Sequence, residues 1–182
     1  DSWDKVKAYA EKNPGKLTIG GTLAQALAAA AVFDEAGLEA TFIPYPGTSA
    51  AVTDMLGGHI DLAVVTPTTA VSLGEKAVPI INVGNQANSE NLTKELGRDV
   101  PWAKDLGYDG VAQPRWIGVH PDTPDAIVAK LDAGIKATLE DKSVTKLITN
   151  IGEEIIYSDQ AKAQATYDRL VEVIKKNLPL MQ

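Results

Sequence analysis

Apolar strand-like segments alternate with helix-like segments over residues 16–66, and this alternation constrains the fold more than any other feature of the chain. The segments KLTIG (16–20), EATFIPY (39–45) and IDLAVVT (60–66) have the character of strands. The runs between them, 22–37 and 47–58, have the composition of helices and end in glycine. A strand, helix, strand order predicts parallel pairing with right-handed crossovers. We therefore expect an α/β fold with a mainly parallel sheet flanked by helices, in which the third strand is buried on both faces.

Further elements on either side extend this pattern. The sequence predicts a helix over 2–13 with Ser2 as its N-cap, and a helix over 67–73 followed by a strand at 78–84 that joins the same sheet. Asn, Gly and Pro recur throughout residues 84–111. We expect a loop with short helical turns there, which would form a crossover between two lobes.

Capping signals set the expected starts of two more helices. Thr48 or Ser49 should cap the helix within 47–58, and Thr123 should cap a later helix that has Pro124 at its first position. A strand before that helix would carry an edge or bend at Pro114. The elements predicted for the C-terminal part are a strand at 111–119, helices at 123–141 and 143–152, a strand at 153–157 and an amphipathic helix at 159–178.

Composition and missing motifs exclude several classes of function. The net charge of -7 argues against a general nucleic-acid surface, and the absence of cysteine removes disulfides and thiolate metal sites. His59 and His120 lie far apart without a metal-ligand spacing, and His59 is expected to be a solvated turn residue. No nucleophile elbow, Walker loop or dinucleotide fingerprint occurs. We expect no catalytic residues, no metal and no cofactor.

Small residues dominate the three turns that follow the predicted strands. These turns are GGTLAQ (20–25), YPGTS (45–49) and TPTT (66–69). In a parallel sheet such turns share the carboxyl edge, where open α/β folds bind ligands. Each turn offers backbone N–H groups and hydroxyls at a helix N-terminus, which favours a carboxylate or a phosphate. The residues therefore predict an anion-binding edge that needs no nucleophile.

Four blocks of the sequence resemble one family. They are AEKNPGKLTIG (10–20), IPYPGTSAAVTDMLGGHIDLAVV (43–65), DVPWAKDLGYDG (99–110) and TPDAIVAKLDAGIKATLEDKSVTKLITNIGEE (123–154). In this order they are similar to the solute-binding receptors of tripartite tricarboxylate transporters, also called Bug-type receptors.

The resemblance implies a periplasmic-binding-protein-like (type II) fold. We expect residues 14–111 to form the ligand-binding α/β lobe, and residues 1–13 and 112–182 to supply hinge segments and helices that belong to or pack toward a second lobe. The matching blocks all fall in the later part of such receptors. We therefore expect the chain to lack the N-terminal segment of the fold, as a fragment, an excised piece or a shortened relative.

The implied function is capture of a small organic carboxylate for delivery to membrane transporter subunits. The protein would be a periplasmic or otherwise extracytoplasmic, membrane-associated monomer that binds no nucleic acid and has no enzymatic activity. Two alternatives stay open: a ligand-sensing regulatory domain, and a small-molecule enzyme on the same α/β architecture.

The expected ligand contacts combine the three turns with one arginine. For Thr66, simple N-capping of the next helix is an interpretation as good as ligand binding. For Arg115, the alternative to ligand binding is an ion pair at a hinge or on the surface. The full set of expected ligand-binding residues is Gly21, Thr22, Gln25, Tyr45, Gly47, Thr48, Thr66 and Arg115.

Overall fold

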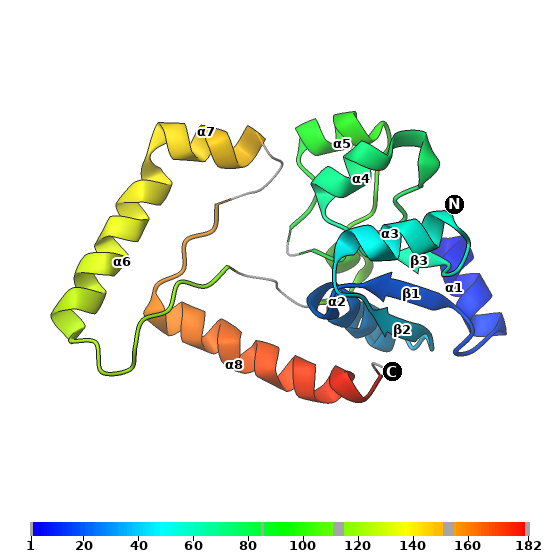
Figure 1. Cartoon of the computed structure of the whole chain (residues 1–182), viewed down its shortest axis with the longest axis horizontal. Helices are drawn as coiled ribbons and strands as arrows, with labels where there is room; N and C mark the ends of the chain where they lie inside the picture. The colour runs from blue at the N-terminus through cyan, green and yellow to red at the C-terminus, as the bar shows by residue number, and fades with distance from the viewer. Residues whose placement is uncertain (1, 85, 111–114, 151–154, 181–182) are drawn as a thin grey trace. The chain divides into compact units, whose positions relative to one another are not determined.

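A computed structural model describes residues 2–84, 86–110, 115–150 and 155–180 of the 182-residue chain. The chain divides into two compact units (Figure 1). Unit 1 comprises Asp1–Gln113 and Arg169–Gln182, and unit 2 comprises Pro114–Asp168.

A three-stranded parallel sheet forms the centre of unit 1. The strands are β1 (Thr18–Gly21), β2 (Thr41–Pro44) and β3 (Leu62–Ala63), in the order β2-β1-β3. Ile19 of β1 stands opposite Phe42 on one side and Leu62 on the other. In Figure 1 the arrows of β1 and β2 point the same way. The parallel α/β fold expected from the alternating sequence is confirmed.

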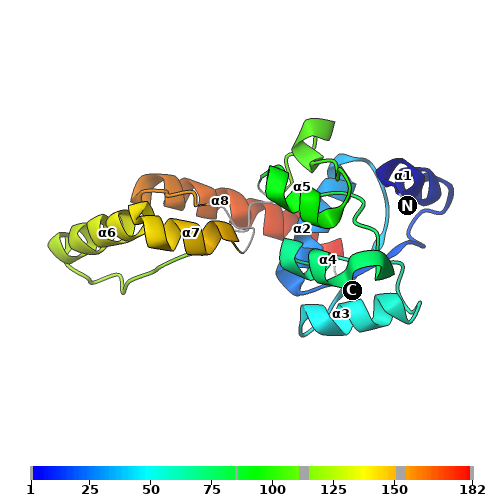
Figure 2. The same ribbon diagram turned by 90° about the horizontal axis from the view of Figure 1, so that it is seen from above.

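Helices connect and cover these strands. The helix between β1 and β2 contacts both of them, and the helix between β2 and β3 contacts β1 and β3. The first crossover runs from β1 to β2, and the second runs back from β2 across β1 to β3. Because the two crossovers run in opposite directions across the sheet, right-handed connections place their helices on opposite faces. Figure 2 shows α3 separated from α2 and α1 across unit 1. The helices of unit 1 before residue 110 are α1 (Trp3–Lys12), α2 (Leu23–Glu35), α3 (Thr48–Leu56), α4 (Pro67–Leu73) and α5 (Glu90–Leu96), with 3-10 turns at Gly74–Lys76 and Ala103–Leu106.

The core of unit 1 is built around α2, whose residues from Gln25 to Phe33 are all buried. A run of alanines lets the helix backbone approach its neighbours closely, and aromatic rings fill the remaining space. Phe33 meets Trp3 and Phe42 edge to face, at centroid distances of 5.3 and 5.8 Å. Edge-to-face pairs add specific attraction to the burial of apolar area.

Two strand predictions for unit 1 are wrong. Residues 78–84 form no strand, and only an isolated bridge joins Asn82 to Trp102. The Asn82 amide nitrogen donates to the carbonyl of Gln86 and its oxygen accepts from the Gly84 N–H, so side-chain bonds organise a loop in place of a ladder. The strand predicted at 60–66 shortens to β3, whose residues are half-buried because β3 pairs only with β1 among the described strands.

Several local predictions are confirmed and two caps are corrected. Ser2 caps α1, and α4 begins and ends as expected. The described residues of the segment 84–111 form short helices between loops. The N-cap of α3 is Gly47, so neither Thr48 nor Ser49 takes that position. The N-cap of α6 is Pro124, one residue beyond Thr123.

The regular elements in the described part of unit 2 are helices. They are α6 (Asp125–Glu140), α7 (Lys142–Asn150) and the first part of α8 (Gln160–Asn177), which ends in unit 1. The strands predicted at 111–119 and 153–157 are wrong for their described residues, 115–119 and 155–157, which have no regular secondary structure. Extended segments become strands only where a partner edge is available, and the described part of unit 2 holds none. Residues 111–114 and 153–154 lie outside the described residues.

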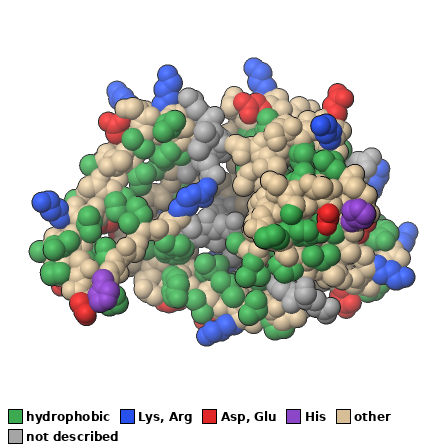
Figure 3. Space-filling view, in the orientation of Figure 1, with side chains coloured by type: hydrophobic (Ala, Val, Ile, Leu, Met, Phe, Trp, Pro, Cys, Tyr) green, Lys and Arg blue, Asp and Glu red, His purple; other side chains and the backbone are tan. Residues whose placement is uncertain are grey.

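Aromatic and apolar contacts hold unit 2 together without a fully buried core. Trp116 and Tyr167 meet edge to face at 6.2 Å, and the Tyr157 hydroxyl donates to Asp132 over 2.7 Å. That hydrogen bond to a carboxylate raises the pKa of Tyr157 to about 12. None of the described residues of unit 2 is buried, and Figure 3 shows apolar side chains exposed over α6.

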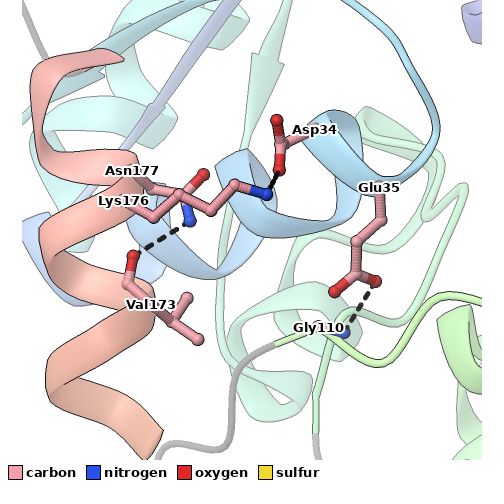
Figure 4. Close-up of polar contacts among 6 residues, drawn as sticks. All are labelled: Asp34, Glu35, Gly110, Val173, Lys176 and Asn177. Carbon is pink, nitrogen blue, oxygen red and sulfur yellow. Dashed lines mark hydrogen bonds and ion pairs between the residues drawn. The ribbon is translucent and has the colours of Figure 1, made fainter.

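The end of α8 is anchored within unit 1, as Figure 4 shows. Lys176 forms an ion pair with Asp34 of α2. The hydrogen bond to Asp34 is the largest cause that raises the pKa of Lys176, and the negative charge of Asp34 is the next. Asn177 is buried and its amide nitrogen donates to the carbonyl of Val173 over 3.0 Å. The ion pair attaches the C-terminal helix to the central helix of the sheet domain, whereas the Asn177 bond lies within α8.

Candidate functional site

The carboxyl edge of the sheet, where β1, β2 and β3 end, carries the three turns singled out in the sequence. The N–H of Tyr45 donates to the carbonyl of Gly21 over 2.7 Å, and the N–H of Val64 donates to the carbonyl of Gly20 over 2.8 Å. These bonds hold the chain beyond β2 and β3 against the end of β1. The turns after the three strands therefore begin at the same edge of unit 1.

Glycines at the end of β1 let the neighbouring chains approach closely. A Cβ atom added to Gly20 would lie 2.5 Å from Ile60 Cδ1 and 2.7 Å from Tyr45 Cε2. A Cβ atom added to Gly21 would lie 3.1 Å from Gln25 Cβ. The end of the central strand is thus covered by side chains from the adjacent turns and from α2, which no larger residue would allow without movement.

The first turn of α2 is closed by a capping box. The Thr22 hydroxyl accepts from the Gln25 N–H over 3.4 Å, and the Gln25 side-chain oxygen accepts from the Thr22 N–H over 3.0 Å. This arrangement satisfies two backbone donors that the helix itself leaves unpaired. Thr22 is therefore the N-cap of α2, with Gln25 as its reciprocal partner.

Gln25 also joins the first turn to the second. The Thr48 hydroxyl donates to Gln25 Oε1 over 3.1 Å, so the starts of α2 and α3 share one acceptor oxygen. Gly47, the N-cap of α3, provides no side-chain cap for that helix. The first N–H groups of α3 are consequently left to backbone, water or ligand partners, at the positive end of the helix dipole.

Tyr45 points toward α3 through its hydroxyl. The hydroxyl donates to Asp54 over 2.7 Å, while the ring packs on Gly20. The hydrogen bond to Asp54 is the main cause that raises the pKa of Tyr45, followed by desolvation. Asp54 is a hydrogen-bond partner of this candidate residue that the sequence does not reveal, because nothing in the spacing of the chain marks a tyrosine and an aspartate nine residues apart as a pair.

Thr66 lies in the third turn and caps α4. Its hydroxyl accepts from the Thr69 N–H over 3.3 Å and lies 3.0 Å from the hydroxyls of Thr68 and Thr69. Among the described residues no hydrogen bond joins Thr66 to Thr22 or Thr48. The N-cap alternative for Thr66 is thus present in the structure, and its ligand contact stays a prediction.

Arg115 is set apart from the other seven expected residues, which all belong to unit 1. It lies in unit 2, where it is exposed. The structure therefore brings Gly21, Thr22, Gln25, Tyr45, Gly47 and Thr48 to one connected edge, with Thr66 in the neighbouring turn, and leaves the role of Arg115 as a prediction.

A second polar pair, missed from the sequence, secures the other end of β1. Thr18 donates to Asp61 Oδ2 through its N–H over 2.8 Å and through its hydroxyl over 2.7 Å. The Asp61 N–H donates back to the Thr18 hydroxyl over 2.9 Å. This reciprocal set fixes the register of β3 against β1 and so positions the turn that follows β3.

The residues that the structure describes contain no group of three His, Asp or Glu side chains placed to hold a metal ion. None of their helices combines the length and the apolar character needed to cross a lipid bilayer. The candidate side chains of unit 1 are neutral, so any charge recognition at this edge comes from backbone dipoles and hydrogen bonds.

The fold of the chain is similar to part of the fold of two solved structures. Superposition on a solved structure described as a periplasmic transporter gives a TM-score of 0.67 at 22% identity and covers 99% of this chain and 61% of that one. The R. palustris protein Rpa4515, solved with adipate, gives a TM-score of 0.68 at 23% identity and covers 96% of this chain and 60% of that one.

The sequence matches the model of the tripartite tricarboxylate transporter family receptor, TctC, over residues 3–182, and the chain belongs to this family. It is 30% identical over 182 residues to the UPF0065 protein in the TAR-I ttuE-ttuC' intergenic region of Agrobacterium vitis, covering 93% of this chain and 51% of that protein. It is 28% identical over 183 residues to the UPF0065 protein in the gbd 5'region of Cupriavidus necator, covering 96% and 52%. The chain thus spans about half the length of the curated relatives that it matches. The family resemblance drawn from the four sequence blocks is confirmed.

Proposed function

We propose that the carboxyl edge of the unit 1 sheet binds a small organic carboxylate, and that the chain acts as a solute-binding part of a transport receptor. The observation that carries this proposal is the meeting of the α2 and α3 N-termini at Gln25, which receives hydrogen bonds from both Thr22 and Thr48. Membership of the TctC receptor family supports the class of function.

The chemistry of this edge favours an anion. The N-termini of the two helices carry partial positive charge, and the start of α3 has no side-chain cap. The glycines of β1 leave the backbone close to the turns. A relative of the same fold was solved with adipate, a dicarboxylate, and we extend that ligand class to this chain.

The remaining parts of the proposal follow from the family. The protein would work outside the cytoplasm as a monomer, pass its ligand to membrane transporter subunits, and have no enzymatic activity. Arg115 stays a proposed carboxylate contact. The regulatory and enzymatic alternatives have no observation in the described residues that favours them over transport.

The test is calorimetric titration of the 182-residue chain with adipate, succinate and citrate. We expect binding of at least one of them, and a Thr48→Ala variant should bind it roughly three- to tenfold more weakly, because the link between the two helix starts is lost. Thr53→Ala is the matched control on the same helix, since its hydroxyl bonds only the Ser49 carbonyl. Failure of all three anions to bind wild-type protein would overturn the proposed function.

A further inference from the structure

Gln25 is an unusual side chain in α2, because it is polar and only 9% exposed. Burial of a carboxamide is unfavourable unless its oxygen and nitrogen find hydrogen-bond partners. The capping box explains why the oxygen is satisfied. It does not explain the amide nitrogen.

The two ends of the carboxamide are distinguishable by chemistry. A backbone N–H can only donate, so the atom that faces Thr22 N at 3.0 Å must be the oxygen. The Thr48 hydroxyl donates to the same oxygen at 3.1 Å. These two donors hold the amide plane in one orientation, with the NH₂ group on the opposite end from Thr22 and Thr48.

The NH₂ group of Gln25 has no acceptor among the described residues. Two buried side-chain atoms lack a hydrogen-bond partner in the described residues, and Gln25 Nε2 is not one of them. Because Nε2 is unpaired and not fully buried, solvent reaches it. This unpaired donor belongs to a side chain that is only 9% exposed, and the two bonds to its oxygen hold it in the first turn of α2, beside the start of α3. This is a second observation, independent of the helix dipoles, that points to a ligand at the carboxyl edge.

We propose that Gln25 Nε2 donates a hydrogen bond to the ligand and selects for an acceptor at that end. This inference rests on the proposed function and deepens it. An ionised carboxylate or a carbonyl oxygen fits the donor, whereas an ammonium group would place donor against donor. The capping box serves two purposes: it starts α2, and it fixes which atom of Gln25 the ligand meets.

The test replaces the side-chain NH₂ group of Gln25 with an oxygen. Gln25→Glu keeps an oxygen that accepts from Thr22 and Thr48, and glutamate suits this capping-box position. The second oxygen replaces the NH₂ donor with a negatively charged acceptor. We expect the melting temperature to be preserved and the affinity for adipate, or for whichever of succinate and citrate binds wild type best, to fall roughly 10- to 100-fold.

Gln160→Glu is the matched control, because it adds the same charge at the exposed first residue of α8. Its affinity should equal that of wild type. If wild type and Gln25→Glu bind the anion equally, the role of Gln25 is overturned while the proposed function stands. If wild type binds none of the three anions, both are overturned.

A measurement on unmodified protein guards against a variant that fails to fold. In a nitrogen-proton correlation spectrum, the Gln25 side-chain NH₂ signals should shift on saturation with the bound anion, with a larger change than those of Gln160. Unchanged Gln25 signals at saturation would contradict the proposal.

Discussion

At the scale of single residues, Gly20 decides how closely the second turn can lie against β1. Its neighbours Ile60 and Tyr45 occupy the space that a side chain would need, at 2.5 and 2.7 Å from an added Cβ atom. Tyr45 cannot move freely, because its hydroxyl is bonded to Asp54. The position therefore links strand packing to the placement of a candidate ligand-binding turn.

We predict that Gly20→Ala destabilises the protein by about 1–3 kcal/mol, because the methyl group overpacks the strand end. Chemical denaturation followed by circular dichroism measures this change. Gly47→Ala is the control, since no heavy atom lies within 4 Å of its added Cβ and its φ of -168° is extended backbone. It should cost only about 0.5 kcal/mol as a poorer N-cap. Equal losses in the two variants would refute the packing argument.

At the scale of elements, helix starts are set by side chains a few residues away. Asp141 caps α7 by accepting from the Ser143 N–H over 2.8 Å and from the Val144 N–H over 3.3 Å. The Ser143 hydroxyl also donates to it, and these bonds lower the pKa of Asp141, with the hydroxyl bond as the largest cause. A lowered pKa means that the folded helix favours the charged carboxylate.

This cap makes α7 sensitive to acid. The stabilisation is complete above the ordinary pKa of 3.8 and is lost as the pH falls through the lower folded value. We predict that the amides of residues 143–146 lose exchange protection below about pH 3.8 in wild type. Asp141→Asn keeps a capping oxygen without the titration, so its α7 protection should vary less over the same range. A wild-type profile as flat as that of Asp141→Asn would count against this prediction.

At the scale of the whole molecule, the two units differ in how much apolar area they bury. All fully buried hydrophobic residues among those described belong to unit 1, between Trp3 and Ala103. In unit 2, large apolar side chains such as Ile117 and Leu147 remain 75% and 66% exposed. An apolar groove of about 520 Å³ lies within unit 2, lined by Ile117, Ile127, Lys130, Leu131, Gly134, Ile135, Thr138 and Leu139.

This difference predicts unequal local stability. Because local opening is easiest where few apolar contacts are broken, the amides of α6 should exchange with solvent at least roughly 100-fold faster than those of α2 in the isolated 182-residue chain. Hydrogen exchange read by mass spectrometry checks this with α2 as an internal reference. Equal protection of α6 and α2 would show that unit 2 does not open separately.

The sequence by itself determined the features that depend on neighbours within a few residues. The alternation of apolar strands and helices identified the parallel α/β architecture, and local hydrogen-bonding groups identified the caps at Ser2 and Thr66. These interactions close loops of three or four residues, so the chain needs no distant partner to form them.

The tertiary structure alone decided which extended segments pair and which side chains meet. Residues 78–84 and 115–119 have apolar, strand-like composition, yet a strand exists only where another strand presents a free edge. Thr48 was expected to cap its own helix, but it donates to Gln25, twenty-three residues away in the chain. Such contacts depend on how the crossovers bring separate turns to one edge, because the energy of a hydrogen bond between distant residues exists only after the intervening chain has folded.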